Sequence, residues 1–102
     1  MDEIKKVYEG RRCIVRCYGA GVFFAEVAVL DGKTAVLHNA RRLWYWEGAA
    51  SLSQMANEGV KRPRECKFTV TVDELVVAEV IEIIPCTDAA CASIDGVPVW
   101  KM

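Results

Sequence analysis

Hydrophobic and polar residues alternate along most of this chain with a period of two, which is the pattern of a half-buried β-strand. The runs that show this pattern are short, rich in β-branched or aromatic residues, and separated by turn residues. They cover residues 11–18, 22–30, 33–38, 40–46, 67–72, 75–84 and 97–102. The run at 22–30 is apolar almost throughout, so we expect both of its faces to be covered.

Turns and side-chain facing follow from the same pattern. Asp31-Gly32 is typical of a tight hairpin, and Asp73-Glu74 predicts a further turn. In the strand 67–72 we expect one apolar set to face inward, namely Phe68, Val70 and Val72. The strand 97–102 should lie at a sheet edge because Pro98 cannot donate to a ladder, and Trp100 should either close the core or meet another subunit.

Helix signals occur at two places. Ser51 begins a helix that ends at Gly59, and Thr87 begins a second one that ends near Gly96. Residues 1–10 form either a short helix or a frayed end.

Together these elements predict an α+β domain built on a small curled antiparallel β-sheet or a partly open barrel. We expect about six strands and two short helices. The 102 residues fit one domain, which we place at residues 11–102, after an N-terminal segment formed by residues 1–10.

The stretch 39–54, NARRLWYWEGAASLSQ, concentrates most of the recognition chemistry of the chain. As a strand, its first half alternates side chains between two faces, one with Arg42, Trp44 and Trp46 and the other with Arg41, Leu43 and Tyr45. The glycine-alanine turn lets the backbone approach a neighbouring segment, and the following serine and glutamine form a capping box. Guanidinium groups bind anions, aromatic rings stack on bases, and a helix N-terminus favours negative charge. The predicted ligand site therefore comprises Arg41, Arg42, Trp44, Tyr45, Trp46, Ser51, Ser53 and Gln54.

A purely structural interpretation of the same residues stays open, because aromatic strands usually fill cores and capping boxes usually only begin helices. The single histidine, His38, is typical of a hydrogen-bonded surface group rather than of a catalyst. The basic loop 60–66 either contributes a cation to the ligand site or is simply solvated.

Composition bears on the partners. The hydrophobic content is 53%, more than a chain this small can bury, so we expect a homo-oligomer; a well-packed monomer is the alternative. The net charge of −1 argues against binding to bulk nucleic acid. Residues 1–68 hold 12 Lys and Arg against 8 Asp and Glu, a balance of +4, whereas residues 69–102 hold 1 against 6, a balance of −5. The basic part contains the predicted site and would favour a small anionic ligand there.

The cysteines at positions 13, 17, 66, 86 and 91 are odd in number, and no secretory signal precedes them. A reduced, cytoplasmic protein with mostly buried thiols accounts for them. Their spacing does not predict a metal site, and no motif predicts a cofactor or a catalytic residue. Cys66 lies in the basic loop and has either a lowered pKa or, as we expect, an inert buried thiol. No apolar run approaches the length of a membrane span.

The run ARRLWYWEGAASLSQMANEGVKRP, with KFTVTVDEL and IEIIPCT further along, resembles a family of small uncharacterised phage and prophage proteins. The resemblance covers most of residues 11–102. It implies a phage-encoded protein acting in the cytoplasm of a bacterial host, and it brings no activity or catalytic residue to any position. Small accessory phage proteins often counter host defence, by sequestering nucleotide signals or by blocking a protein.

Three functions follow as hypotheses. The first is non-enzymatic binding of a small anionic, nucleotide-like ligand, which would sequester a host defence signal. The alternative is an interaction module that inhibits a host or phage protein, because arginine, tryptophan and tyrosine dominate protein hot spots. The second alternative is single-stranded nucleic-acid binding through the same aromatics.

Overall fold

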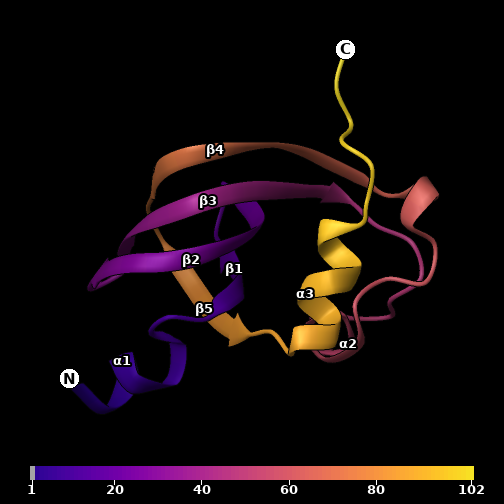
Figure 1. Ribbon diagram of the computed structural model, residues 1–102. Coiled ribbons are helices and arrows are strands. Elements are labelled where there is room, and N and C mark those ends of the chain that lie inside the picture. Colours follow the sequence, from indigo (N-terminus) through magenta and orange to yellow (C-terminus); the bar gives the residue numbers. More distant parts are fainter. Residues whose placement is uncertain (1) are drawn as a thin grey trace.

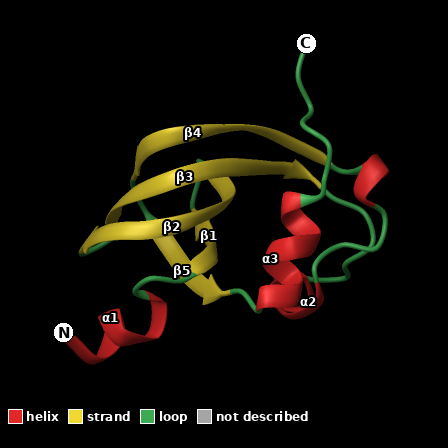
Figure 2. Cartoon of the chain, in the orientation of Figure 1, coloured by secondary structure: helices red, strands yellow, loops and turns green. Residues whose placement is uncertain are grey.

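The computed structural model describes residues 2–102, which form one antiparallel sheet with helices at its ends (Figure 1). The elements are α1 (Asp2–Tyr8), β1 (Arg12–Cys17), β2 (Gly21–Asp31), β3 (Thr34–Tyr45), α2 (Leu52–Glu58), the 3₁₀ turn η1 (Pro63–Glu65), β4 (Lys67–Val77), β5 (Val80–Pro85) and α3 (Asp88–Asp95). The predicted α+β class with a curled antiparallel sheet is confirmed. Figure 2 separates the strands from the helices that flank them. The described chain has five strands and three α-helices, against the expected six and two.

The sheet curls because its two edge strands are consecutive in the chain. The strand order is β4-β3-β2-β1-β5, so β4 and β5 lie at opposite edges although only a tight turn joins them. That turn also meets the other turns: the Val80 amide donates to the Lys33 carbonyl at 2.9 Å, and the Tyr18 amide donates to the Glu79 carbonyl at 2.9 Å. The sheet therefore wraps around a concave core, yet it stays open because β4 and β5 are not neighbours in it.

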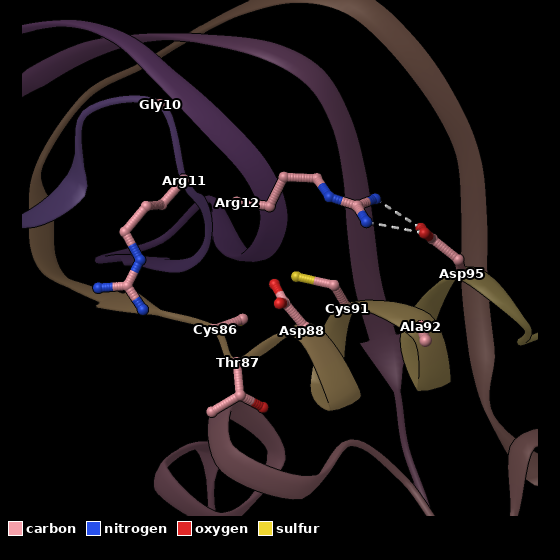
Figure 3. Close-up of a pocket in the computed structure, with 9 residues that line it drawn as sticks. All are labelled: Gly10, Arg11, Arg12, Cys86, Thr87, Asp88, Cys91, Ala92 and Asp95. Atoms are coloured by element: carbon pink, nitrogen blue, oxygen red, sulfur yellow. Dashed lines mark hydrogen bonds and ion pairs between the residues drawn. The ribbon is translucent and has the colours of Figure 1, made fainter.

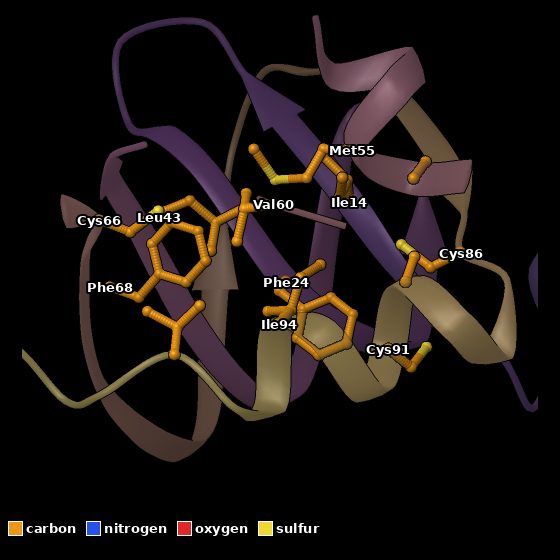
Figure 4. Close-up of a cluster of buried hydrophobic side chains, with 13 residues drawn as sticks. Ile14, Phe24, Leu43, Met55, Val60, Cys66, Phe68, Cys86, Cys91 and Ile94 are labelled. Atoms are coloured by element: carbon orange, nitrogen blue, oxygen red, sulfur yellow. The ribbon is translucent and has the colours of Figure 1, made fainter. Parts of the chain in front are cut away.

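Both faces of the central strands are buried over part of their length. Val15 and Phe23 belong to a core inside the curl, whereas Ile14 and Phe24 belong to a second core between the sheet and helices α2 and α3 (Figure 4). The prediction that the run 22–30 is covered on both faces is confirmed for its first half, and Val29 near its end is exposed.

The two strands predicted on either side of Asn39 are one strand, β3, with a bulge at that residue. Asn39 has a φ of 51°, a conformation that asparagine tolerates better than most residues. Phe24 pairs with Arg41 while Glu26 pairs with His38, so two residues of β3 face one residue of β2. The bulge determines which face of the sheet each later side chain of β3 occupies.

Strand β4 continues through the position where the sequence predicted a turn. Asp73 and Glu74 remain in the strand, and the chain reverses only at Glu79, which has a φ of 57°. Because β4 is an edge strand, its carboxylates stay in water at little cost. The predicted inward facing of Val70 and Val72 is also wrong: they are 47% and 42% exposed, whereas Phe68 is fully buried as expected. The register of β4 shifts between Phe68, which pairs with Leu43, and Thr71, which pairs with Arg41. Phe68 therefore faces the helices, while the valines lie on the other face, beyond the cover of the curl.

The segment between β3 and α2 folds back as expected. The Gly48 carbonyl accepts from the Lys61 amide at 3.1 Å. Ser51 caps α2 by accepting from the Gln54 amide at 3.1 Å, and the Gln54 side chain returns to the amide just before the cap. Thr87 caps α3 in the same way. Both predicted helices are confirmed.

The predicted strand 97–102 is wrong. These residues form an irregular tail, with one bridge between Val99 and Phe68 and a hydrogen bond of 2.8 Å from the Trp100 amide to the Phe68 carbonyl. Pro98 interrupts any longer ladder because it lacks an N–H. The tail is held instead by a side chain, that of Arg41.

Arg41 is 6% exposed and joins three segments of the chain. Its guanidinium donates to the carbonyls of Thr69 at 2.9 Å, Ile94 at 2.9 Å, Val97 at 2.7 Å and Pro98 at 3.2 Å. The Ile94 carbonyl belongs to the last turn of α3, where unpaired carbonyls and the helix dipole favour a cation. The guanidinium also lies over the Phe68 ring, 5.4 Å from its centroid. Strand β3, strand β4, helix α3 and the tail are thus fastened by one residue.

A comparison of two glycine substitutions tests the close approach at Gly48. A Cβ at Gly48 would lie 2.5 Å from the Lys61 nitrogen and 2.6 Å from that of Arg62, whereas one at Gly19 would have nothing within 4 Å. Both residues have similar positive φ angles, 90° and 84°, so Ala costs about 1–2 kcal/mol of backbone strain at either. We expect Gly48→Ala to lose about 1–3 kcal/mol more than Gly19→Ala in urea denaturation, because the loop must move. Equal losses would contradict the close packing of this loop.

The neighbouring arginines provide a matched test of the Arg41 contacts. Arg41→Met should lower the free energy of unfolding by about 3 kcal/mol, because it leaves several buried carbonyls without a donor. Arg42→Met should cost less than about 1 kcal/mol, since Arg42 is exposed and contacts mainly the Phe23 ring. Chemical denaturation measures both, and similar losses for the two variants would disprove the structural role of Arg41.

Candidate functional site

The structure places the predicted ligand residues of β3 in different environments. Arg41 lies in the interior, with its guanidinium among carbonyls. Arg42 and Trp44 are exposed on the opposite face, and Arg42 lies 4.7 Å from the Phe23 ring centroid. Trp46 is half-buried against the core beneath the helices. The sequence correctly separated Arg41 from Arg42, but the two guanidinium groups do not converge on a shared hollow.

Two of the predicted ligand residues at the start of α2 form hydrogen bonds within the helix cap. Ser51 accepts from the Gln54 amide, the Gln54 side chain accepts from the Ala50 amide at 2.7 Å, and Ser53 is exposed. The cavities that contain Arg41 and Arg42 are not lined by Ser51, Ser53 or Gln54. The cap therefore begins the helix and lies apart from the arginines.

Four side chains form an exposed cluster, which we name the aromatic surface: Trp44, Tyr45, Lys67 and Trp100. The indoles of Trp44 and Trp100 stack with their centroids 6.2 Å apart at an interplanar angle of 18°. The Lys67 ammonium lies 5.6 Å from the Trp100 ring centroid and 5.9 Å from that of Tyr45. Trp44 is 63% exposed, Trp100 45% and Tyr45 44%. The hydroxyl of Tyr45 also donates to the Glu47 carboxylate.

A shallow groove of about 200 Å³ lies on the same face of β3 as Trp44. Arg42 and Phe23 line it from one side, and the exposed Val70 and Val72 of β4 line it from the other. This position explains why the alternating valines of β4 were misassigned. Alternation assumes that Phe68 and the valines share a face, and it does not reveal the register shift in β4 that places them on opposite faces.

A second cavity, which we name the arginine cavity, has a volume of about 410 Å³ and lies between the sheet and the tail. Its lining comprises Arg12, Phe24, Asn39, Arg41, Thr71, Asp95, Val97 and Val99. Arg12 donates to both carboxylate oxygens of Asp95, at 2.7 and 2.8 Å. These hydrogen bonds raise the pKa of Arg12, whereas burial lowers the pKa of Arg41. Sequence analysis missed Arg12, Asn39 and Thr71, because only the folded sheet brings them to one place.

A third cavity of about 620 Å³ lies at the start of α3 (Figure 3). Arg11 and Arg12 point in different directions here, and Asp88, Asp95, Cys86 and Cys91 complete the charged and thiol groups around it. Burial raises the pKa of Cys86 to about 12, so its thiolate is disfavoured at neutral pH.

The cysteines and the histidine considered in the sequence analysis lie in structural environments. Burial raises the pKa of Cys66, so the alternative of a lowered value in the basic loop is wrong. All five cysteines are free and buried, as predicted. His38 lies at the surface, with its Nε2 atom 3.3 Å from the Glu74 carboxylate. Within residues 2–102, no group of three or more His, Cys, Asp or Glu is arranged to hold a metal ion. None of the helices in this range has the length and apolar character needed to cross a membrane.

Comparison with known proteins places the chain in a family. Neither a curated protein nor a solved structure matches it. The model of one family, described as a domain of unknown function (DUF6948), matches residues 10–94. The match spans all five strands, helix α2 and nearly all of α3. The expectation of an uncharacterised family is thereby confirmed, and the chain belongs to the DUF6948 family.

Proposed function

We propose that this protein is a non-enzymatic interaction module that binds another protein through the aromatic surface. The stacked and exposed pair of Trp44 and Trp100 is the observation that carries this proposal. Tryptophan and tyrosine dominate the hot spots of protein interfaces, and clusters of exposed apolar side chains mark interaction sites.

The aromatic surface is also organised in advance of binding. Arg41 holds the carbonyls of Val97 and Pro98, and the Trp100 amide donates to Phe68, so the tail that presents Trp100 is fixed. A fixed anchor loses little conformational entropy when a partner arrives, and this loss is one of the main costs of association.

The chemistry of the surface describes its partner. Lys67 lies beside the Trp100 indole, and the exposed Arg42 lines the largely apolar groove on the same face of β3 as Trp44. The exposed Lys101 follows Trp100 in the chain. An apolar anchor with acidic groups next to it complements this arrangement. A second copy of the chain is one form of the proposal, because Val70, Val72 and Val76 are exposed on the edge strand β4 and support the expected homo-oligomer.

The resemblance to phage proteins supplies the setting of the proposal. We place the protein in the cytoplasm of a bacterial host, where its partner is a host or phage protein whose activity it blocks.

Capture from bacterial lysate tests the aromatic surface. A partner that the wild-type protein retains should be lost with Trp44→Ala or Trp100→Ala, at a cost of about 2 kcal/mol or roughly a thirtyfold loss of affinity. Tyr18→Ala is the matched control, because Tyr18 is an exposed aromatic residue outside this surface. It should retain the partner.

Light scattering of the same variants identifies a second copy as the partner if the wild type is a dimer and Trp44→Ala is a monomer. Capture and mass that are the same in all variants would contradict the proposal.

A small nucleotide-like ligand remains the second candidate, and the position of Lys67 favours it. An ammonium group beside two aromatic rings offers a phosphate partner next to a surface for a base. Single-stranded nucleic acid would use the same rings, although the net charge of −1 gives it no bulk attraction.

Thermal shift against nucleotides and cyclic dinucleotides tests the ligand. We expect stabilisation of the wild type and of Arg16→Met, whose cation lies elsewhere, and a loss of this stabilisation in Lys67→Met and Trp44→Ala. Binding at 100 times the dissociation constant corresponds to about 2.7 kcal/mol of added stability. No shift with any of these compounds would exclude this candidate and leave the protein partner.

A further inference from the structure

We propose that the arginine cavity binds a small oxyanion, namely the phosphate or carboxylate group of a small molecule. This site is separate from the aromatic surface, and it does not depend on the interaction proposed above. It differs from the ligand site predicted from the sequence, because of those eight residues only Arg41 lines it.

The cavity is built from neighbouring strands on one side. Phe24, Arg41 and Thr71 are register partners across β2, β3 and β4, so they form one row on the sheet. Helix α3 and the tail close the other side with Asp95 and Val97. A space of about 410 Å³ with these walls accommodates a small organic anion.

The charges that line the cavity leave one cation unmatched. Arg12 and Asp95 form a bidentate ion pair and neutralise each other. Arg41 donates to neutral carbonyls, and no carboxylate among residues 2–102 forms an ion pair with it. The lining therefore carries a net charge of +1 with its positive group in the low-dielectric interior, where an anion gains most from it.

Donors for an oxyanion are present as well. The Nη1 atom of Arg41 donates to one described carbonyl, that of Ile94, although it has two N–H groups. The hydroxyl of Thr71 and the amide of Asn39 belong to residues that line the same space. Asn39 is held at its position by the bulge of β3. One unmatched guanidinium with nearby neutral donors is a common arrangement for phosphate and carboxylate recognition.

The cavity at the start of α3 provides a contrast. It is larger, but its two arginines, Arg11 and Arg12, are matched by the two aspartates Asp88 and Asp95. Its lining therefore has no net charge, and it offers an anion no comparable attraction.

Titration with inorganic phosphate and with acetate, at constant ionic strength set by chloride, tests the site. Chemical shifts of backbone amides should report saturable binding by the wild type at residues around the cavity. Asp95→Asn removes the competing carboxylate and should tighten binding by about tenfold. The matched control is Glu82→Gln, which breaks the Arg16–Glu82 pair of 2.8 Å on β1 and β5 and changes the net charge equally. It should leave the affinity unchanged.

Thr71→Val probes the site without altering its charge, because Thr71 is exposed and a loss of its hydroxyl leaves the buried arginine contacts in place. It should weaken binding severalfold, while Trp44→Ala should leave oxyanion binding intact. Preference for phosphate over acetate, or the reverse, identifies the group that the natural ligand carries. No saturable binding of either anion, or equal effects of Asp95→Asn and Glu82→Gln, would overturn the proposal.

Discussion

The buried guanidinium of Arg41 is the interaction on which this end of the molecule depends. A cation without a carboxylate partner is costly in an apolar interior unless its hydrogen bonds are satisfied. Arg41 meets this requirement with backbone carbonyls from β4, from the last turn of α3 and from the tail. The arrangement is possible because the C-terminal turn of a helix leaves carbonyls unpaired and electronegative. The residue thus supplies donors to carbonyls at the point where three segments meet, although the Ile94 carbonyl also accepts from the Val97 amide at 3.1 Å.

Both proposed recognition features derive from this one contact. The tail is fixed at Val97 and Pro98, and as a consequence it places Trp100 against Trp44 on the outside of the sheet. The same path of the tail forms a wall of the arginine cavity and leaves the charge of Arg41 beside it. The aromatic surface and the anion site proposed in the arginine cavity therefore share a structural support, although they lie on different faces of β3 and recognise different chemistry.

Local patterns in the sequence predicted β1, β2 and the two capped helices, because period, turns and caps are properties of a few adjacent residues. Local patterns do not predict a residue's environment where the group that it contacts lies far away in the sequence. The carbonyls that bind Arg41 lie 28 to 57 residues away, so the stretch 39–54 alone does not show that this arginine is held inside the fold. The exposed Val70 and Val72 follow the alternation of a core strand, and only the register shift of β4 in the folded sheet places them on the other face from Phe68.

The bulge at Asn39 explains why two adjacent arginines have such different environments. Leu37 and Arg41 are four residues apart and would share a face of a regular strand. Leu37 instead lies in the core inside the curl, while Arg41 faces the helices, because the extra residue reverses the phase of β3. Because of this reversal, Arg42 and Trp44 lie on the concave face of the sheet, in the part of that face that the curl leaves exposed. A strand without the bulge would continue the phase of Leu37 through Arg41 and would bring its guanidinium to the concave side, away from the α3 carbonyls. One residue with a positive φ thus determines which arginine supports the fold and which remains available to a partner.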